Sequence, residues 1–438
     1  MARTPSRRHF IQQAAAGLVG ATFVRPRNVG AQGANDRIRV GVVGFSNRLR
    51  GALLPAILEL APKMNVSITA LADIWSLRRE EGEKFITDKT GQRPRVFRNT
   101  DELYDSRSVD AVIIATADFQ HALHGIEAMR AGVDAYVEKP LANRMVDART
   151  FLDVARETKR IVQMGTQRRS SATTQNIREY LRTGEFGRIV SVDIARNVNQ
   201  PDRWRRPDEV KRLRREDTDW SRYLMGRTKD AWDPRKYLEF RLFWPYSSGI
   251  PDQWLVHDID ALQFVTGIAH PRSVVANGGV YTWRDGRQNA DTMTAVFEYG
   301  DGNGGTFQAT FASRMTNSAD SREVYYSNGG SLDVRTGEVT GEGGLSDRYA
   351  KAAGMTAKRV NPRTLQEART AAGDDGAADS AVVAHFRNWI ECLRSRTPTV
   401  ADAQAGYDHS IAVCMAIEAL HSGRRVTFDE QRRDVTTD

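Results

Sequence analysis

The stretch DAVIIATADFQHALHGIEAMRAGVDAYVEKP, from Asp110 to Pro140, decides the fold. It begins with an apolar run, Ala111 to Ala115, which is typical of a strand buried on both faces of a parallel sheet. A helical pattern with one apolar face follows and ends at Gly132. A second strand, Val133 to Val137, leads into Glu138-Lys139-Pro140. This order predicts one right-handed strand–helix–strand unit of a parallel sheet.

Polar side chains follow both strands of this unit. Thr116, Asp118 and His121 come after the first strand, and Glu138 and Lys139 come after the second. In open parallel sheets, ligands bind beyond the carboxyl ends of the strands. We therefore expect the active site to lie between these two strand ends.

A similar unit precedes this stretch. The run from Arg37 to Val43 predicts the first strand, and the turn Gly44-Phe45-Ser46-Asn47-Arg48-Leu49 leads into a helix. Dinucleotide-binding turns usually read Gly-x-Gly-x-x-Gly, because the backbone must approach a pyrophosphate at a helix N-terminus. Only Gly44 of these glycines is present, so the turn alone equally fits an ordinary α/β connection. With its flanking strand and helix it predicts phosphate binding by Gly44, Ser46 and Asn47.

The next predicted strand, Val66 to Ala72, ends in Asp73. A carboxylate at this place accepts hydrogen bonds from the adenosine ribose hydroxyls and repels a 2′-phosphate. Asp73 therefore favours NAD as the cofactor. Arg78 and Arg79 follow closely and keep NADP as an alternative.

The order of motifs resembles one known family. The segment Thr116-Ala117-Asp118-Phe119-Gln120-His121, followed by Glu138-Lys139-Pro140, is similar to the glucose–fructose oxidoreductase/inositol dehydrogenase (Gfo/Idh/MocA) family. Its members typically show Thr-Pro-x-x-x-His and then Glu-Lys-Pro, so Ala117 departs from the pattern. The resemblance runs from about Arg37 to about Val426. It implies a nicotinamide-dependent oxidoreductase in which Thr116, His121, Glu138 and Lys139 lie near the cofactor.

The pattern changes beyond residue 188. Strand-like runs separated by turns such as Asp285-Gly286 predict a mostly antiparallel sheet in a second, α+β domain. The resemblance implies that its open face forms homodimers or homotetramers. Helices from about Ala381 to Ser395 and from Ala403 to Leu420 are expected to end the fold. The predicted division is 1–33 leader, 36–165 Rossmann domain and 166–438 C-terminal domain. The expected strands are Ile189–Ile194, Ser273–Ala276, Thr292–Phe297, Gly305–Phe311 and Glu323–Tyr326.

A second key stretch, SSGIPDQWLVHDID, runs from Ser247 to Asp260. A regular helix opening after Pro251 would place Gln253, His257 and Asp260 on one face. The resemblance implies an Asp-x-x-x-His-x-x-Asp helix whose first Asp and His reach the substrate. Gln253 replaces that first Asp, and Asp252 is expected to point about a quarter-turn away.

Hydride transfer from a hydroxyl-bearing carbon needs a proton acceptor and a group that stabilises the developing oxyanion. Lys139 suits the oxyanion, and partial burial beside a cationic nicotinamide would depress its pKa enough for it to relay a proton. His257 suits proton transfer because its ordinary pKa lies near neutrality, and Gln253 adds a hydrogen bond without charge. The resemblance places Gln167 and Arg168 at the rim of the site, and Asp260 is assigned to the substrate. The alternatives are a solvated lysine and a structural histidine.

The first residues are predicted to be an export signal. Ser6-Arg7-Arg8-His9-Phe10-Ile11-Gln12 resembles the twin-arginine signal, and small residues around Ala31 suit cleavage. The apolar segment Ala14 to Val24 is too short to cross a bilayer, which needs roughly 20 residues. No cysteine follows it, so no membrane anchor is expected. The twin-arginine machinery carries folded proteins, which implies a periplasmic enzyme that retains its cofactor. A disordered basic tail is the alternative.

Composition excludes several classes. The net charge of +8 comes from 63 basic and 55 acidic residues, and part of it lies in the leader. No nucleic-acid motif and no cluster with metal-ligand spacing is present. Cys392 and Cys414, the two cysteines, are expected to be buried thiols.

Together these features predict an exported NAD(P)-dependent oxidoreductase acting on CH–OH groups of a sugar, cyclitol or other polyol. One alternative uses the same site in a redox-neutral lyase, epimerase or glycosidase reaction with bound NAD. Another is a non-catalytic nucleotide- or sugar-binding protein, which the missing glycines and Gln253 leave open.

Overall fold

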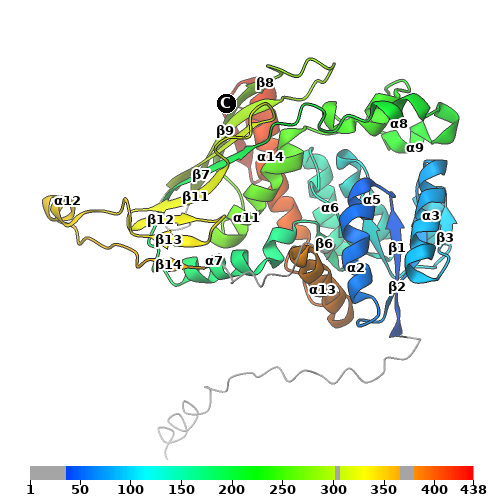
Figure 1. Cartoon of the computed structure of the whole chain (residues 1–438), viewed down its shortest axis with the longest axis horizontal. Helices are drawn as coiled ribbons and strands as arrows, with labels where there is room; N and C mark the ends of the chain where they lie inside the picture. Colours follow the sequence, from blue (N-terminus) through cyan, green and yellow to red (C-terminus); the bar gives the residue numbers. More distant parts are fainter. Residues whose placement is uncertain (1–35, 301–305, 366–378, 438) are drawn as a thin grey trace, which may run out of the picture. The chain divides into compact units, whose positions relative to one another are not determined.

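The computed structural model describes residues 36–300, 306–365 and 379–437 (Figure 1). The predicted export signal lies outside these described residues. Contacts divide the chain into Met1–Arg37 and Ile38–Asp438, and every element below belongs to the second unit.

Within the described residues, the first sheet has six parallel strands in the order β3-β2-β1-β4-β5-β6. The order changes direction between β1 and β4, and this switch point is where open α/β sheets bind ligands. All four residues of β4 are buried, as the apolar run predicted. The predicted Rossmann domain is therefore confirmed. Its strands are β1 (Ile38–Val43), β2 (Val66–Ala72), β3 (Arg95–Phe97), β4 (Ala111–Ile114), β5 (Asp134–Val137) and β6 (Val162–Met164).

Helices connect these strands, and the helix after β1 is irregular. It begins with a π-helical segment and continues as a regular helix, which has Pro55 in its first turn. The helix α5 links β4 to β5, as the first stretch predicted. The elements are η2 (Leu49–Leu53), α2 (Leu54–Leu60), α3 (Ser76–Thr90), α4 (Thr100–Asp105), α5 (His121–Arg130) and α6 (Met145–Thr158).

Over the same described ranges the second sheet has ten strands, in the order β14-β13-β12-β11-β7-β10-β9-β8-β15-β16. Its pairs are antiparallel except for β7 with β10, which run parallel. The mostly antiparallel second domain is therefore confirmed. The strands that the sequence predicted are β7 (Ile189–Asn197), β8 (Ser273–Gly279), β9 (Thr292–Gly300), β10 (Thr306–Arg314) and β11 (Arg322–Ser327).

Five further strands were missed because they are short. The prediction that two helices end the fold is also wrong, because β15 and β16 follow them and form an antiparallel pair beside β8. The added strands are β12 (Gly330–Asp333), β13 (Glu338–Thr340), β14 (Arg363–Thr364), β15 (Val426–Asp429) and β16 (Asp434–Thr437).

The two C-terminal helices hold the two sheets together. The helix α14 (Ala403–Ser422) contacts α6 of the first domain and β8 of the second. The helix α13 (Ser380–Ser395) packs on the first sheet, where Phe386 stacks on Tyr136 of β5 with ring centroids 4.5 Å apart. Burial of such large side chains is the main stabilising contribution at this contact. The first domain thus includes a helix encoded far beyond residue 165.

A connecting segment, residues 198–246, is called the strap here. It contains short helices and an aromatic cluster in which Trp220, Tyr223 and Tyr246 pack with Phe119 of the first domain. Figure 1 shows its helices α8 and α9 near α3 and β3. The cluster fixes the strap beside the end of β4. The helices are α8 (Pro207–Arg212), α9 (Trp220–Leu224), α10 (Pro234–Leu238) and the 3-10 helix η6 (Phe240–Leu242).

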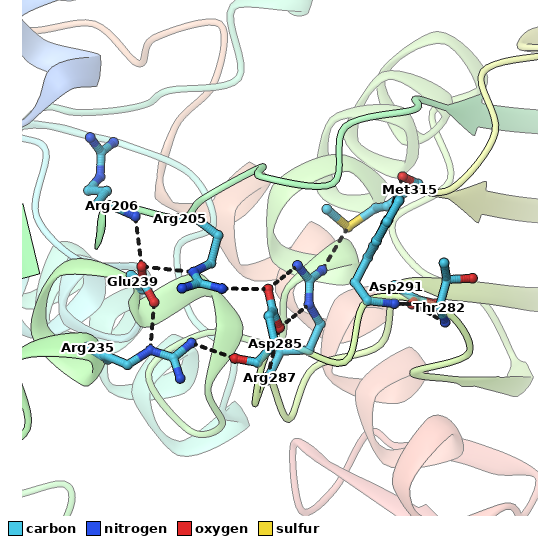
Figure 2. Close-up of polar contacts among 10 residues, drawn as sticks. Arg205, Arg206, Arg235, Glu239, Thr282, Asp285, Arg287, Asp291 and Met315 are labelled. Atoms are coloured by element: carbon cyan, nitrogen blue, oxygen red, sulfur yellow. Dashed lines mark hydrogen bonds and ion pairs between the residues drawn. The ribbon is translucent and has the colours of Figure 1, made fainter. Parts of the chain in front are cut away.

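Glu239 is the polar anchor of the strap (Figure 2). Its buried carboxylate accepts hydrogen bonds from Arg205 Nε at 3.0 Å, from the Arg206 backbone N–H at 2.7 Å and from Arg235 Nε at 2.8 Å. Asp285 holds Arg205 from the other side, with an ion pair of 3.3 Å. Burial opposes ionisation, but these donors hold the pKa of Glu239 below its ordinary value. The network therefore fixes the backbone between α8 and the preceding loop.

Replacing this carboxylate tests the anchor. Glu239→Gln is expected to lower the free energy of unfolding by about 2 kcal/mol, because it leaves half-buried arginines without their counter-charge. Urea denaturation at pH 7 measures this loss, and Glu391→Gln on the exposed side of α13 is the control. The carboxylate's stabilisation is present above pH 4.5 and is lost as the pH falls through its depressed pKa, so the difference should shrink in acid. Equal stability of the two variants at pH 7 would contradict the anchoring role.

Candidate active site

A pocket of about 990 Å³, including its open mouth, lies at the carboxyl ends of β1, β2 and β4. The first domain contributes the turn after β1, Asp73 and Thr116, and the strap contributes the opposite wall. Its place at the switch point is the place that the sequence predicted for a dinucleotide. The strap residues that line it include Arg206, Glu209, Tyr223, Tyr237, Phe240 and Arg241.

Gly44 begins the turn in a left-handed conformation, with φ of 84°. A Cβ atom at this position would lie 2.8 Å from Thr116 Cγ2 and 3.0 Å from the Ala115 carbonyl oxygen. The backbone therefore passes so close to β4 that only glycine fits. Ser46 accepts the Leu49 N–H through its hydroxyl at 3.3 Å, which leaves the hydroxyl proton available to a phosphate. The single remaining glycine is thus required by geometry.

Asn47 contacts the strap across the pocket. With its amide oxygen turned toward Arg206, it accepts hydrogen bonds from Nη1 at 2.8 Å and from Nη2 at 3.1 Å. The phosphate-binding turn and the strap therefore meet here, next to the predicted cofactor.

Asp73 binds the backbone as well as facing the pocket. Its carboxylate accepts the N–H groups of Phe45 at 2.7 Å and Trp75 at 2.8 Å, and burial raises its pKa. Nearby Arg78 pairs with Glu81 at 2.6 Å and with Glu209 at 2.9 Å. Because two carboxylates already compensate this arginine, the pocket gives little extra attraction to a 2′-phosphate, which favours NAD.

Four buried polar atoms in the turns after strands of the first sheet have no hydrogen-bond partner among the residues that the structure describes. They are Arg48 Nη2, Thr116 Oγ1, Thr166 Oγ1 and Gln167 Oε1, which follow β1, β4 and β6. Buried polar groups are normally hydrogen-bonded. A dinucleotide carries phosphates, ribose hydroxyls and an amide that suit such groups, so the residues present fit this cofactor.

His121 joins the two strand ends rather than projecting into the pocket. Its Nδ1 lies 2.7 Å from the Pro140 carbonyl oxygen, and its Nε2 lies 3.3 Å from the Thr116 carbonyl oxygen. Burial lowers its pKa, so the ring is neutral at pH 7. His121 is therefore a positioning residue close to the predicted cofactor site.

Glu138 is paired inside the fold. Its carboxylate accepts Arg48 Nε at 2.8 Å and the Lys139 backbone N–H at 3.1 Å. Burial would raise its pKa, but the charges of Arg48 and Lys139 hold it below the ordinary value. No local pattern indicated this role for Arg48, because the pairing joins two turns far apart in the chain.

Lys139 reaches from the end of β5 to the second domain. Its Nζ donates to the carbonyl oxygens of Gln253 at 3.0 Å and Asp252 at 3.4 Å. Burial lowers the pKa of Lys139 to about 8, against the opposing charges of Asp118 and Glu138. The depressed pKa that the sequence predicted is therefore present before any cofactor charge is added.

The helix that Lys139 contacts does not begin as a regular helix. A π-helical segment, η7 (Pro251–Leu255), precedes α11 (Val256–Thr266), and the Val256 N–H donates to the Pro251 carbonyl oxygen. The predicted regular spacing over residues 253–260 is thus wrong at its start. A π-helix bonds residue i to i+5, so Gln253 and His257 are not separated by one regular helical turn. The quarter-turn expected for Asp252 no longer applies.

Asp252 is a site residue that the sequence did not select. It is fully buried, and its Oδ2 accepts the Ser248 N–H at 2.6 Å. Its Oδ1 is buried without a partner in the described ranges. Burial and the nearby charge of Asp118 raise its pKa to about 7. An Asp five residues before His257, after a proline, was the available signal.

Gln253 is hydrogen-bonded to two side chains of opposite charge. Its amide nitrogen donates to Asp118 Oδ2 at 2.5 Å, and its amide oxygen accepts Arg241 Nε at 2.8 Å. Ser247 also donates to Asp118 Oδ2, at 2.6 Å. Gln253 therefore positions Asp118 and Arg241 at the edge of the site, and its role in chemistry stays a prediction.

His257 is half-buried on α11. Burial, followed by the charges of Lys139 and Arg196, lowers its pKa well below 6.5. The expectation that it titrates near neutrality is therefore wrong, and the imidazole is neutral at pH 7. The influence of Lys139 also means that the two groups lie within electrostatic range of each other.

Two predicted substrate residues are held within the fold. Arg168 donates to Asp258 at 2.7 Å and to Glu323 at 2.6 Å. Asp260 pairs with Arg169 at 2.8 Å and with His409 at 3.2 Å, and it is almost inaccessible to solvent. These bonds use both carboxylate oxygens of Asp260, which argues against its predicted contact with substrate.

The described residues contain no group of three or more His, Cys, Asp or Glu side chains that could hold a metal ion. No helix in the described part of the chain is long and apolar enough to cross a membrane. Cys392 and Cys414 are buried free thiols, as predicted.

The fold and pocket define a two-domain protein of the dinucleotide-binding class. The family described as "Oxidoreductase family, NAD-binding Rossmann fold" matches residues 38–166, and the "GFO/IDH/MocA C-terminal domain" matches residues 220–332. Together these matches cover more than half of the chain. The chain belongs to the Gfo/Idh/MocA family, and its first domain is an NAD-binding domain.

Individual relatives match over parts of the chain. Glycosyl hydrolase family 109 protein 2 from Shewanella sp. (strain ANA-3) is 28% identical over 164 residues, covering 36% of this chain and 35% of the relative. The 1,5-anhydro-D-fructose reductase of Ensifer adhaerens is 30% identical over 163 residues, covering 37% and 46%. The chain therefore spans less than half the length of these curated relatives. The WlbA dehydrogenase from Bordetella pertussis, solved with NADH and UDP-GlcNAcA, shares the fold, with a TM-score of 0.64, 17% identity and coverage of 90% and 98%.

Proposed function

We propose that the protein is an NAD-dependent oxidoreductase that transfers hydride between a CH–OH carbon of a carbohydrate and the nicotinamide ring. The observation that carries this proposal is the electrostatic coupling of Lys139, which follows a strand of the NAD-binding sheet and has a pKa of about 8, with a neutral His257 on the second domain. The names of the Ensifer and Bordetella proteins, a reductase and a dehydrogenase acting in sugar chemistry, support the substrate class.

Each side chain of the site has a separate role in the proposed reaction. NAD, held at the turn after β1 and beside Asp73, would supply the hydride acceptor. The neutral imidazole of His257 accepts the hydroxyl proton, and the Lys139 ammonium stabilises the oxygen as negative charge develops on it. Glu138 and Asp118 keep Lys139 in place electrostatically, because both favour its charged form. Asp252 is buried near this lysine and suits the onward transfer of a proton at neutral pH.

Export, retention and assembly complete the proposal. The twin-arginine-like segment supports export of the folded protein to the periplasm, and the open face of the second sheet suits a homodimer or homotetramer. The strap supports tight NAD retention, since Arg206 contacts the phosphate-binding turn through Asn47 and Glu209 pairs with Arg78.

The purified protein provides the first test. We expect nicotinamide dinucleotide to copurify, and we expect its near-ultraviolet absorbance to change when a carbohydrate from a panel of sugars and polyols is added. Bound NAD should gain the band of the reduced cofactor, with one equivalent of oxidised sugar formed. A full panel without any absorbance change in cofactor-loaded protein would contradict the proposal.

A redox-neutral reaction is the second candidate, and the name of the Shewanella glycosyl hydrolase supports it. Here the same site would oxidise a sugar transiently and reduce it again after elimination or epimerisation. A product with altered linkage or configuration, formed with catalytic NAD and no net reduced cofactor, would favour this reaction over net oxidation.

A further inference from the structure

Arginines are concentrated in the strap, and several of them have carboxylate partners. Figure 2 shows Glu239 bonded to Arg205 and Arg235, and Asp285 bonded to Arg205 and Arg287. Each of these guanidinium groups is compensated by the fold itself. These arginines stabilise the strap, and their positive charges are already paired with carboxylates.

Arg203 and Arg241 differ from these neighbours. Neither forms an ion pair with any carboxylate in the described ranges, and Arg203 Nε is buried without a partner. Arg241 Nε donates to the neutral amide of Gln253. The charge of Asp118 acts on Arg241 without a direct ion pair, because its Oδ2 already accepts bonds from Ser247 and Gln253. Burial and the charge of Arg241 together lower the pKa of Arg203, so two half-buried cations lie near each other. Such an arrangement is costly unless an anion compensates it.

Two tryptophans lie beside this pair of cations. The Arg203 guanidinium lies 5.0 Å from the centroid of Trp254 and 5.8 Å from that of Trp204, and the two rings are 5.6 Å apart. Trp204 has a φ of 70°. A positive φ is rare for a bulky residue, and such strained backbone is often found at functional sites. Trp254 follows Gln253, whose carbonyl oxygen binds Lys139. The cations and the aromatic rings therefore adjoin the proposed reaction site.

We infer that the protein binds a carbohydrate carrying an anionic substituent, and that Arg203 and Arg241 hold this substituent while Trp204 and Trp254 form an apolar wall against the sugar. This inference rests on the proposed function and names its substrate class. Guanidinium groups bind carboxylate or phosphate through two parallel hydrogen bonds. The substituent is thus a sugar carboxylate or a sugar phosphate.

The cofactor pyrophosphate is the competing ligand for these arginines. Arg241 lines the dinucleotide pocket, whereas Arg203 does not. Replacement of Arg203 therefore distinguishes an effect on substrate binding from an effect on cofactor binding. If Arg203 served the cofactor, its replacement would release NAD, and if it serves the substrate, the content of bound NAD would be unchanged.

Calorimetric titration of the NAD-loaded protein with D-glucose, D-glucuronate and D-glucose 6-phosphate tests the inference. At least one anionic sugar is expected to bind roughly 10-fold or more tightly than glucose, and the comparison of the two anions distinguishes carboxylate from phosphate. Arg203→Met is expected to remove most of this preference, roughly 10- to 100-fold, while glucose binding and bound NAD stay unchanged.

Arg348→Met is the matched control, because Arg348 also lies over an aromatic ring, that of Tyr349, but at an exposed position. Equal binding of the three sugars by the wild type, or loss of NAD in Arg203→Met, would overturn the inference. Selective binding of an anionic sugar without any change in cofactor absorbance would instead overturn the proposed hydride transfer and leave the inference standing. Cofactor reduction by neutral sugars, with no preference for anionic ones, would support the proposed hydride transfer and overturn the inference of an anionic substrate.

Discussion

Lys139→Met is expected to lower kcat/KM for the carbohydrate by roughly 10²- to 10³-fold, the usual effect of removing one stabilising group from a developing oxyanion. Methionine keeps the length and apolar stem of the side chain but removes the ammonium that bonds the carbonyl oxygens of Gln253 and Asp252. Single-turnover reduction of bound NAD measures the chemical step. The rate is compared per bound NAD, because loss of the buried ammonium also removes its bonds and lowers stability, and Lys84→Met on the surface is the control.

The pH dependence of the same variant series gives an independent readout. The pKa of Lys139 is about 8, so the ammonium and its effect on the oxyanion are present below this pH and are lost as the pH rises through it. The rate of hydride transfer should therefore fall above pH 8 in the wild type. Lys139→Arg should lose this decline, because arginine stays protonated. A rate that rises through pH 8 would show that neutral Lys139 is the base and contradict its role as a cation.

Gly44→Val is expected to weaken NAD binding by at least roughly 10-fold. A left-handed backbone costs an L-residue roughly 1–2 kcal/mol, and the new Cβ would meet the side chain of Thr116 and the carbonyl oxygen of Ala115. The turn must move away from β4, so its N–H groups no longer point at the pyrophosphate. Titration of the cofactor-free protein with NADH fluorescence measures the Kd.

The matched control for this substitution is Gly91→Val. Gly91 has a similar φ, 69°, at the end of α3, but no atom lies within 4 Å of its Cβ direction. It should lose a little stability and bind NAD normally, which separates backbone strain from the close approach at β4. Equal NAD affinity of both variants would show that the turn does not carry the phosphate.

Local patterns were enough to predict the first domain. The unbroken apolar run before Thr116 and the strand before Lys139 have this character because both faces of the sheet are covered. Lys139 could be selected for the same reason, since the end of a parallel strand fixes its position. The second sheet was predicted less completely, because strands such as β13 and β14 have too few residues for an alternating pattern.

Several interactions of the candidate active site join residues that are far apart in the sequence, so no local pattern predicts them. The π-helical segment at Pro251 breaks the regular spacing expected before His257, and no local pattern marks it. The pairing of Arg48 with Glu138 joins two turns of the first domain that are far apart in the sequence. The burial that depresses the pKa of His257 arises only in the assembled fold. Arg48 could therefore not be selected from the sequence, whereas Asp252 had only its place after a proline as a signal.

The packing of α13 on the first sheet affects the order of events during synthesis. Proteins emerging from the ribosome usually fold their N-terminal domain first. Here Trp389 and Phe386 cover the face of a sheet whose last strand ends at Met164, so that sheet stays partly uncovered until almost the whole polypeptide has been translated. Nascent chains of this protein should therefore depend on chaperones for longer than their early nucleotide domain alone would require.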